Sequence, residues 1–314
     1  MSPNLNPIID IQGLTKEYKY KIVVDNIHLK IEDSCFALLG LNGAGKTTTI
    51  LMLLGLVKPN KGTASILGKD IIKSYNEICN KVGFLPEDVG FFPYLTGREH
   101  LELIIRLRGN TLNTEENTQY YLKWSGIEKE YWDRRTRTYS RGMKQRLGLA
   151  QAFAGNPKVV FLDEPLSNID PLGRDDLINK IREKRKEGTT IIISSHIILE
   201  IEQLADSLAI IDKGKIIRSG TFFELTQSIG LNEYEINRIN NTEEISLKVL
   251  NDILVAEEDL IIDKPTILSE KLIFRTKNPE KISNLIKKYE DFHFMPISGT
   301  LNKLYRKFIE GNKR

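Results

Sequence analysis

The sequence predicts an α/β fold built on a buried parallel sheet and followed by a small α+β domain. Three apolar runs, at residues 36–39, 159–162 and 191–193, are bounded by polar residues, as strands buried on both faces of a parallel sheet are. A helical pattern follows the first run, over residues 46–56. Beyond about residue 220 glycines become rare and short strand and helix patterns follow one another, which indicates a second unit.

The first elements are a half-buried strand, a buried strand and a helix. Apolar residues at 27, 29 and 31 alternate with polar ones, the period of a strand with one buried face. The run at 36–39 ends at Gly40, and a glycine-rich loop leads into the helix. Residues 87–155 are richer in helical patterns and charge, so we expect a helical insertion between the strands.

The later elements have clear boundary signals. Asp170 and Pro171 form a helix start, a capping carboxylate followed by proline at the first helical position, and Gly188 suits the end of that helix. Residues 210–217 predict a hairpin with a Lys-Gly turn. We therefore place one domain at residues 7–221, with the helical insertion at about 87–155, and a second domain at residues 222–314.

In the second domain we expect a strand at 268–275, a helix at 279–289, a strand at 293–297 and an amphipathic helix at 301–310. The last of these interleaves Lys303, Arg306 and Lys307 with apolar residues, which would suit a membrane anchor. Its apolar face is short, however, so packing against the domain core is the preferred interpretation.

Composition excludes several classes of protein. The chain has 45 basic and 42 acidic residues and a net charge of +3, so no basic excess favours a nucleic-acid partner. No apolar stretch approaches the ~20 residues that cross a bilayer, and the first residues lack a secretory signal pattern. The two cysteines cannot build a disulfide framework or a four-ligand zinc site. We expect a cytosolic-type protein that reaches a membrane only through a partner.

A phosphate-binding loop is predicted at residues 40–47, GLNGAGKT, between an apolar strand and a helix. Glycines let backbone N–H groups turn toward phosphates, and the helix N-terminus adds further donors and its positive dipole end. We expect Lys46 to reach the β- and γ-phosphates and the Thr47 hydroxyl to bind Mg²⁺. A dinucleotide site fits less well, because the glycines do not follow the G-x-G-x-x-G order. The residues expected to contact the nucleotide here are Asn42, Gly43, Ala44, Gly45, Lys46, Thr47 and Thr48.

Two adjacent carboxylates, Asp163 and Glu164, end the apolar run at 159–162. Open α/β sheets bind ligands at this edge of their strands. Successive strand residues point to opposite sides, and the strand end lets the second carboxylate turn toward the phosphates. We assign Asp163 to Mg²⁺ and Glu164 to the role of general base. Taken alone, the pair could also be a solvated strand end.

With these two motifs in place, the chain resembles an ATP-binding-cassette (ABC) ATPase over about residues 8–220. The segment 139–147, YSRGMKQRL, resembles the signature loop, which in the family closes on the γ-phosphate bound by the other subunit. The resemblance implies a P-loop NTPase fold of ABC type, with a mixed β core and a helical signature subdomain. It also implies that Ser140 supplies a hydroxyl donor and Gly142 a backbone N–H; alternatively, Ser140 is an ordinary helix cap.

The signature departs from the common Leu-Ser-Gly-Gly-Gln form, with Tyr139, Arg141 and Met143 at its first, third and fifth positions. Similar variants are usual in the branch of drug-exporter and lipid-exporter ATPases. The serine and the second glycine of the motif are kept, so the resemblance still implies γ-phosphate binding.

Three further positions match the family in the order of its motifs, and a fourth, Glu87, departs from its pattern. His196 matches the switch histidine, which contacts the γ-phosphate and positions water. Asp170 matches the loop that crosses the dimer interface, a role compatible with helix capping. Tyr18 matches the aromatic residue that stacks on adenine, with Tyr20 close enough to replace it. Glu87 stands where the family has a glutamine that reaches Mg²⁺. A carboxylate at this position can ligate the metal but cannot donate a hydrogen bond as an amide does. Alternatively, the Glu87 side chain faces solvent.

One phosphate loop and one signature loop in the chain imply a head-to-tail dimer, homomeric or heteromeric, that encloses two ATP molecules. The resemblance implies the ATP-hydrolysing motor of a transporter, an exporter by analogy, on the cytoplasmic face of the membrane. Its partner would be an integral membrane subunit, which the helical insertion and the loop around 87–96 should contact. The alternative is a non-transport ABC ATPase that acts on a soluble or nucleic-acid machine; the balanced charge shows no nucleic-acid footprint.

Overall fold

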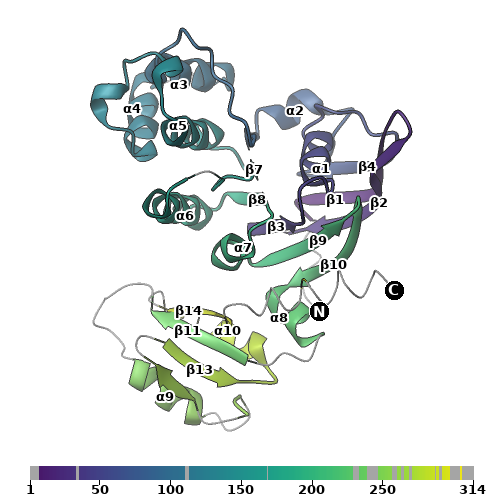
Figure 1. Ribbon diagram of the computed structural model, residues 1–314, viewed down its shortest axis with the longest axis vertical. Helices are drawn as coiled ribbons and strands as arrows, with labels where there is room; N and C mark the ends of the chain where they lie inside the picture. The colour runs from purple at the N-terminus through teal and green to yellow at the C-terminus, as the bar shows by residue number, and fades with distance from the viewer. Residues whose placement is uncertain are drawn as a thin grey trace. The chain divides into compact units, whose positions relative to one another are not determined.

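The chain forms two compact units, Met1–Ile217 and Arg218–Arg314 (Figure 1). A computed structural model describes residues 7–32, 35–109, 113–167, 169–228, 233–238, 247–256, 260–262, 265–268, 271–286, 288–289, 292–297 and 305. The division falls inside strand β10 (Lys215–Thr221), whereas the sequence places the domain boundary between residues 221 and 222.

A six-stranded sheet in the order β10-β9-β3-β8-β7-β6 organises the first unit. The pairs from β9 to β6 are parallel, and every residue of β3, β7 and β8 is buried, which confirms the predicted buried strands. The predicted hairpin is the pair β9 and β10. The strands are β3 (Cys35–Leu39), β6 (Val82–Leu85), β7 (Val159–Asp163), β8 (Thr190–Ser195) and β9 (Ser207–Asp212).

A second, antiparallel sheet in the order β2-β1-β4-β5 lies in the same unit. Its strands are β1 (Ile9–Tyr18), β2 (Lys21–Ile31), β4 (Lys61–Ile66) and β5 (Lys69–Asp70). The side chains of β2 that the alternation predicted to be buried, Ile27, Leu29 and Ile31, are buried. Helix α1 (Lys46–Leu53) contacts β2, β4 and β7 and contributes Ile50 and Met52 to the core shared by the two sheets.

Helix α1 ends earlier than the pattern at 46–56 predicts. Gly55 follows the cap residue Leu54 with φ 69°, a left-handed conformation that terminates helices and that glycine adopts without strain. The apolar residues after Gly55 continued the pattern and hid this stop.

Helices fill the stretch between β6 and β7, as predicted. They are α3 (Gly97–Leu107), α4 (Thr114–Ser125) and α5 (Arg141–Phe153), with 3-10 turns at Lys129–Tyr131 and Thr136–Thr138. A shorter helix, α2 (Tyr75–Cys79), precedes β6. Thr96 and Glu99 form a reciprocal capping box at the start of α3, which satisfies two backbone N–H groups. Apolar residues of α3, α4 and α5 share a core with the six-stranded sheet, so the sheet supports the helical segment directly.

Two helices follow the strands that carry the predicted site. Helix α6 (Pro171–Lys186) begins after β7, with Asp170 Oδ1 accepting the Gly173 N–H at 2.9 Å, and Gly188 follows it with φ 90°. Both predicted boundary signals are thus confirmed. Helix α7 (Ile198–Leu204) begins directly after β8 and contacts α6.

The second unit contains α8 (Phe222–Gln227), β11 (Glu233–Arg238), α9 (Leu247–Ala256), β12 (Thr266–Leu268), β13 (Lys271–Arg275), α10 (Pro279–Ile286) and β14 (Phe292–Pro296). Its sheet has the order β12-β13-β11-β14, and each neighbouring pair is antiparallel. Two β-α-β units, β11-α9-β12 and β13-α10-β14, each enclose a strand of the other. This is the ferredoxin-like arrangement.

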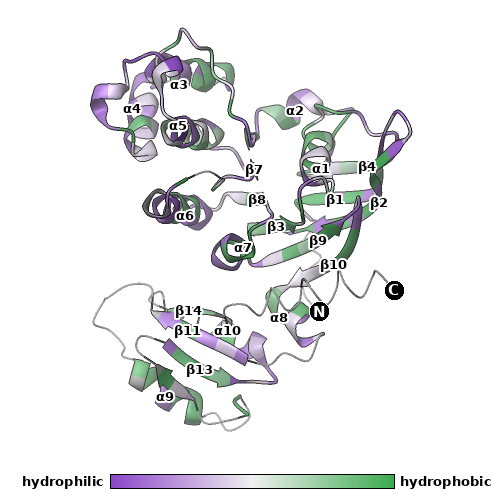
Figure 2. Ribbon diagram, in the orientation of Figure 1, coloured by the Kyte–Doolittle hydropathy of each residue, from purple (hydrophilic) through white to green (hydrophobic). Residues whose placement is uncertain are grey.

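The prediction of one strand over 268–275 is wrong, because β12 ends at Leu268 and β13 begins at Lys271. The middle of β13 is hydrophobic and its ends are hydrophilic (Figure 2), so the apolar pattern located the strand but not the chain reversal before it. The helix predicted at 279–289 and the strand at 293–297 correspond to α10 and β14. The helix predicted at 301–310 lies outside the described residues except for Tyr305.

None of the helices among the described residues has both the length and the apolar character needed to cross a membrane.

Candidate nucleotide-binding site

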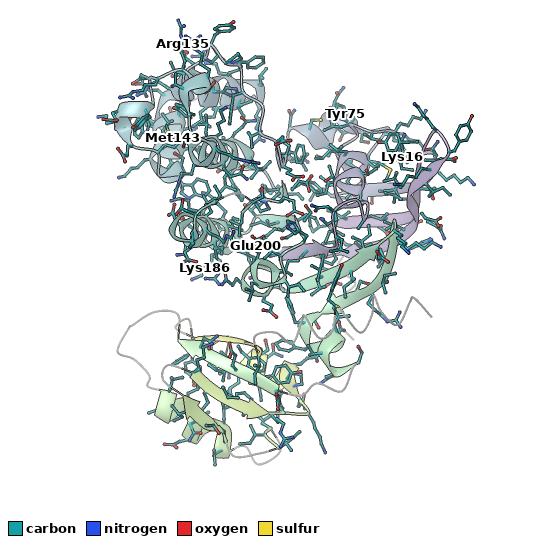
Figure 3. All side chains as sticks on the ribbon, viewed as in Figure 1. Lys16, Tyr75, Arg135, Met143, Lys186 and Glu200 are labelled. Carbon is teal, nitrogen blue, oxygen red and sulfur yellow. The ribbon has the colours of Figure 1, made fainter. Side chains whose placement is uncertain are left out.

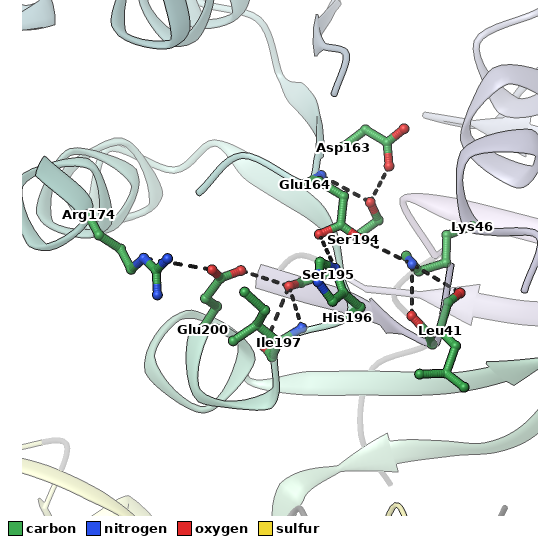
Figure 4. Close-up of polar contacts among 11 residues, drawn as sticks. Leu41, Lys46, Asp163, Glu164, Arg174, Ser194, Ser195, His196, Ile197 and Glu200 are labelled. Atoms are coloured by element: carbon green, nitrogen blue, oxygen red, sulfur yellow. Dashed lines mark hydrogen bonds and ion pairs between the residues drawn. The ribbon is translucent and has the colours of Figure 1, made fainter. Parts of the chain in front are cut away.

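The carboxyl ends of three neighbouring strands, β3, β8 and β7, meet at one edge of the six-stranded sheet. Leu39 of β3 is in register with Ser195 of β8, and Ser194 is in register with Asp163 of β7. The glycine-rich loop, His196 and Glu164 follow these strand ends directly. The parallel topology thus gathers three predicted motifs from distant parts of the sequence into one site (Figure 4).

The glycine-rich loop needs glycine at specific points of its path. A Cβ added at Gly45, where φ is 109°, would lie 2.8 Å from the carbonyl oxygen of Val23. A Cβ added at Gly40 would lie 2.5 Å from the carbonyl oxygen of Ile211. The backbone therefore passes so close to its neighbours that no side chain fits at either position.

Replacing Gly45 with alanine is expected to lower the free energy of unfolding by about 1–3 kcal/mol, because the new methyl group meets a backbone oxygen in a strained conformation. Gly68 is the matched control: it has φ 70°, and its added Cβ meets no atom within 4 Å. Urea unfolding of both variants measures the difference. Equal losses of unfolding free energy in the two variants would show that the contact between the new methyl group and the Val23 carbonyl oxygen adds nothing to the cost of the backbone strain.

Lys46, the first residue of α1, is buried at the edge of the sheet. Its Nζ donates to the carbonyl oxygens of Gly40 at 2.8 Å and Leu41 at 3.4 Å. The same Nζ lies 3.1 Å from Oε1 of Glu164, which is also buried. The three N–H donors of the Lys46 ammonium group thus serve both the backbone of the phosphate loop and the carboxylate of Glu164.

Glu164 occupies the centre of the site because its backbone turns at the end of β7. Its φ is 50°, a left-handed conformation that a non-glycine residue keeps only where its surroundings hold it. Here the Glu164 N–H donates to the carbonyl oxygen of Ser194 at 3.1 Å. Its Oε2 lies 2.9 Å from Nδ1 of His196, whose side chain is 40% exposed. One carboxylate therefore contacts both the buried lysine and the accessible histidine.

Asp163 lies beside Glu164 but is held differently. Its Oδ1 accepts a hydrogen bond from the Ser194 hydroxyl. Its Oδ2 is buried and has no hydrogen-bond partner among the residues that the structure describes. Buried polar atoms normally have a partner, and a carboxylate oxygen is a preferred ligand of Mg²⁺. The residue therefore fits the predicted metal-binding role, together with Thr47, which is exposed in the first turn of α1.

Tyr18 and Tyr20 differ in their surroundings. Tyr18 is the last residue of β1, 45% exposed, and the Lys16 ammonium lies over its ring at 4.9 Å from the centroid. Tyr20 is 99% exposed in the turn after β1. Tyr18 is thus the one of the two whose ring is partly held in place, which favours it for stacking.

The signature residues belong to another part of the unit. Ser140 caps α5 by accepting the Met143 N–H at 3.2 Å, so its capping role is confirmed. Met143 and Lys16 lie on opposite sides of the unit (Figure 3), and α5 and α1 lie on different sides of β7 in Figure 1. Ser140 is exposed and Gly142 is partly exposed, so both are open to a second molecule.

Two other predicted residues are also exposed. Asp170, the cap of α6, lies at the surface. Glu87 follows β6, the strand beyond β7 at the same sheet edge, and its side chain is exposed as well. The structure therefore does not bury either carboxylate with Lys46 and Glu164.

Sequence reasoning missed several polar residues around the site. Gln145 of α5 is buried and donates to the carbonyl oxygen of Pro165 at 2.7 Å, which ties the signature helix to the segment after Glu164. Ser194 and Ser195 are buried at the end of β8. The sequence signal was available, because two hydroxyls close an otherwise apolar strand directly before His196.

Comparison with known proteins places this site in a family. A family model described as "ABC transporter" matches residues 24–167. The uncharacterized ABC transporter ATP-binding protein YhcH of Bacillus subtilis is 31% identical over 276 residues, which cover 82% of this chain and 89% of that protein. The bacitracin transport ATP-binding protein BcrA of Enterococcus faecalis is 37% identical over 221 residues, 69% of this chain and 70% of that protein.

Solved structures agree with this assignment. An ATP-binding subunit of an ABC transporter matches with a TM-score of 0.65 and 28% identity, over 71% of this chain and 94% of that chain. The cassette MJ0796, solved as a dimer bound to ADP and Pi, matches with a TM-score of 0.64 and 21% identity, over 68% of this chain and 98% of that chain; this second likeness concerns the fold alone. The chain therefore belongs to the ATP-binding proteins of ABC transporters, the family whose ATP-binding domains bind ATP with Mg²⁺ and hydrolyse it.

Proposed function

We propose that this chain is the motor of an ABC exporter and drives a separate membrane subunit by ATP-dependent head-to-tail dimerisation. The observation that supports the motor role most directly is the placement of Glu164 in contact with both Lys46 and His196. These contacts join a phosphate-binding cation, a general base and a switch histidine at one sheet edge.

Phosphate binding falls to the loop and to Lys46. In this proposal the loop of Asn42, Gly43, Ala44 and Gly45 passes around the phosphates. Free backbone N–H groups of the loop and of the first turn of α1, which contains Thr48, bind the phosphate oxygens. Charged phosphate oxygens are stronger acceptors than the carbonyls that Lys46 now contacts. Lys46 therefore shifts toward the β- and γ-phosphates when ATP binds and releases Oε1 of Glu164.

The released Glu164 carboxylate then accepts the proton of the water that attacks the γ-phosphorus. His196, partly exposed and in contact with Oε2 of Glu164, orients that water and donates to the γ-phosphate. Asp163, Thr47 and Glu87 would hold Mg²⁺, which neutralises charge on the phosphates.

Adenine binding is assigned to Tyr18. Replacing Tyr18 with alanine is expected to weaken ATP binding by about 1–3 kcal/mol, the usual contribution of an aromatic ring stacked on a base. The change Tyr20→Ala is the control, because that side chain is fully exposed. Titration of each variant with a fluorescent ATP analogue measures the affinities, and a loss confined to Tyr20→Ala would reassign the stacking residue.

Dimerisation is supported by the separation of the signature from the phosphate loop. Ser140, Gly142 and Asp170 are open to solvent at least in part, and the dimeric cassette MJ0796 shares the fold. In the proposed dimer, Ser140 and Gly142 of one chain contact the γ-phosphate on the other, and Asp170 crosses the interface. A homodimer has two complete sites, and a heterodimer uses the same contacts.

Export is supported by the Tyr-Ser-Arg-Gly-Met signature and by relatives that are named bacitracin transport proteins. The membrane subunit would dock on the helical segment and on the loop around 87–96, where Phe92 and Tyr94 are exposed. In this arrangement the chain lies on the cytoplasmic face of the membrane, and nucleic acid has no part in it.

An affinity pull-down from detergent-solubilised native membranes tests the proposal, with Glu164→Gln and Mg-ATP used to hold the dimer closed. We expect an integral membrane protein with several spans to be recovered. Recovery of soluble partners or ribosomes alone, from membranes that are shown to be fully extracted, would support the non-transport alternative instead.

A further inference from the structure

A buried carboxylate, Glu200, lies beside the site and takes no part in binding ATP or Mg²⁺ in the proposed function. Glu200 lies in α7, four residues beyond His196, and is 3% exposed in a run that is otherwise apolar, Ile-Ile-Leu-Glu-Ile. Burial raises the pKa of this carboxyl group, while the hydrogen bond from Ser195 and the charge of Arg174 act in the opposite direction. Burying such a group is costly unless it is paired, so its contacts call for an explanation.

Glu200 fixes the backbone on both sides of His196 through one hydroxyl group. The Ser195 hydroxyl donates to Oε2 of Glu200 at 2.7 Å. The hydroxyl oxygen of Ser195 in turn accepts the N–H of Ile197 at 2.9 Å. His196 is the residue between these two anchors (Figure 4), so the carboxylate limits where the imidazole can lie.

The other carboxylate oxygen of Glu200 faces helix α6, which begins after Asp170, the residue predicted to cross the dimer interface. Oε1 lies 3.9 Å from Nε of Arg174, and neither atom has a hydrogen-bond partner within the described part of the chain. Arg174 is in the first turn of α6, where its N–H donates to the carbonyl oxygen of Asp170 at 2.9 Å. A shift of this turn by a fraction of an ångström would complete or weaken the pair.

We propose that Glu200 is a positioning residue for ATP hydrolysis: it holds His196 through Ser195 and couples that position to the start of α6 through Arg174. The proposal rests on the role assigned to His196 in the proposed function. Contact of Asp170 with the second subunit is then transmitted to His196 through the turn that carries Arg174. The geometry needs no direct contact between Glu200 and the nucleotide.

Two substitutions separate the two halves of this arrangement. Glu200→Gln keeps an acceptor for the Ser195 hydroxyl but removes the charge that faces Arg174, and Ser195→Ala removes the hydroxyl that anchors the backbone. We expect each change to lower kcat by about 10-fold with the KM for ATP nearly unchanged, because misplacement of a catalytic group affects the reaction more than binding. Arg174→Met should act like Glu200→Gln and add little to it.

The decisive measurement is a double-mutant cycle with His196→Ala, with kcat measured per nucleotide-binding site. If Glu200 acts through His196, Glu200→Gln and Ser195→Ala cause no further loss in the His196→Ala background. If the fold-losses in kcat of the single variants multiply in the double variants, the proposal is overturned and Glu200 is a structural residue. Glu235→Gln is the matched control, because it removes another buried, ion-paired carboxylate in the second unit and should leave kcat unchanged.

The failures can be told apart. Wild-type kcat in His196→Ala alone would contradict the proposed role of His196, and with it this inference. A large loss in His196→Ala combined with multiplicative effects of Glu200→Gln would contradict the inference and leave the proposed function standing. If Glu200→Gln does not fold, Ser195→Ala, which removes a single oxygen, gives the same test.

Discussion

Replacing Glu164 with glutamine is expected to lower kcat for ATP hydrolysis by about 10²- to 10⁴-fold, the usual contribution of a general base. The amide is close in size and still accepts a hydrogen bond, but it cannot take up the proton of the attacking water. Since the phosphate loop and Lys46 are unchanged, affinity for ATP should be kept. Phosphate release under saturating Mg-ATP and equilibrium binding of an ATP analogue measure the two effects separately.

The structure supplies a control for this change. Glu235→Gln alters a carboxylate of similar burial in the second unit and should leave hydrolysis at the wild-type rate. A Glu164→Gln enzyme that retained more than about a tenth of the wild-type kcat, well above the residual activity that loss of a general base leaves, would show that another group accepts the proton.

Replacing Lys46 with methionine is expected to weaken ATP binding by about 1.5–3 kcal/mol for each charged hydrogen bond lost. Methionine fills a similar volume but offers no donor to the phosphates. Calorimetric titration with Mg-ATP measures the loss. Wild-type affinity in Lys46→Met would show that the backbone of the loop binds the phosphates without the ammonium group.

The same change also tests the buried ion pair. Without nucleotide, loss of Lys46 leaves Glu164 buried beside His196 alone, and removal of one partner of a buried pair costs about 3–5 kcal/mol of stability. We expect Lys46→Met with Glu164→Gln to be more stable than Lys46→Met, because the double variant buries no unpaired charge. Urea unfolding of the three variants measures the coupling, and strictly additive losses would contradict the pairing.

The core of the first unit could be predicted because its strands are short, apolar and parallel. The runs at 36–39, 159–162 and 191–193 have the length and the apolar character of strands in a buried parallel sheet, and residues placed directly after such strands meet at one edge of the sheet. The contact between Glu164 and Lys46 follows from that topology. The left-handed turn that directs Glu164 into the site depends on Ser194, a contact that no local pattern shows.

The other features were missed either because neighbouring apolar residues hid a local stop signal or because they depend on contacts between different elements. The hairpin of β12 and β13 was missed because residues 268–275 were predicted as one strand, although Ser269 and Glu270 interrupt the apolar residues. Glu200 was missed because an acid on a short apolar helix has no local signature: its partners, Ser195 and Arg174, lie on two other elements. The interruption of α1 at Gly55 was hidden by the apolar residues that follow.

In the proposed mechanism, ATP closes two copies of this fold into a dimer in which the signature of one chain completes the site of the other. The most direct measurement is the mass of Glu164→Gln by light scattering, with and without saturating Mg-ATP, in parallel with a Ser140→Ala, Glu164→Gln variant. We expect an ATP-dependent dimer that is weakened by Ser140→Ala. A protein that stays monomeric with Mg-ATP, even when its natural partner from the pull-down is added, would contradict it.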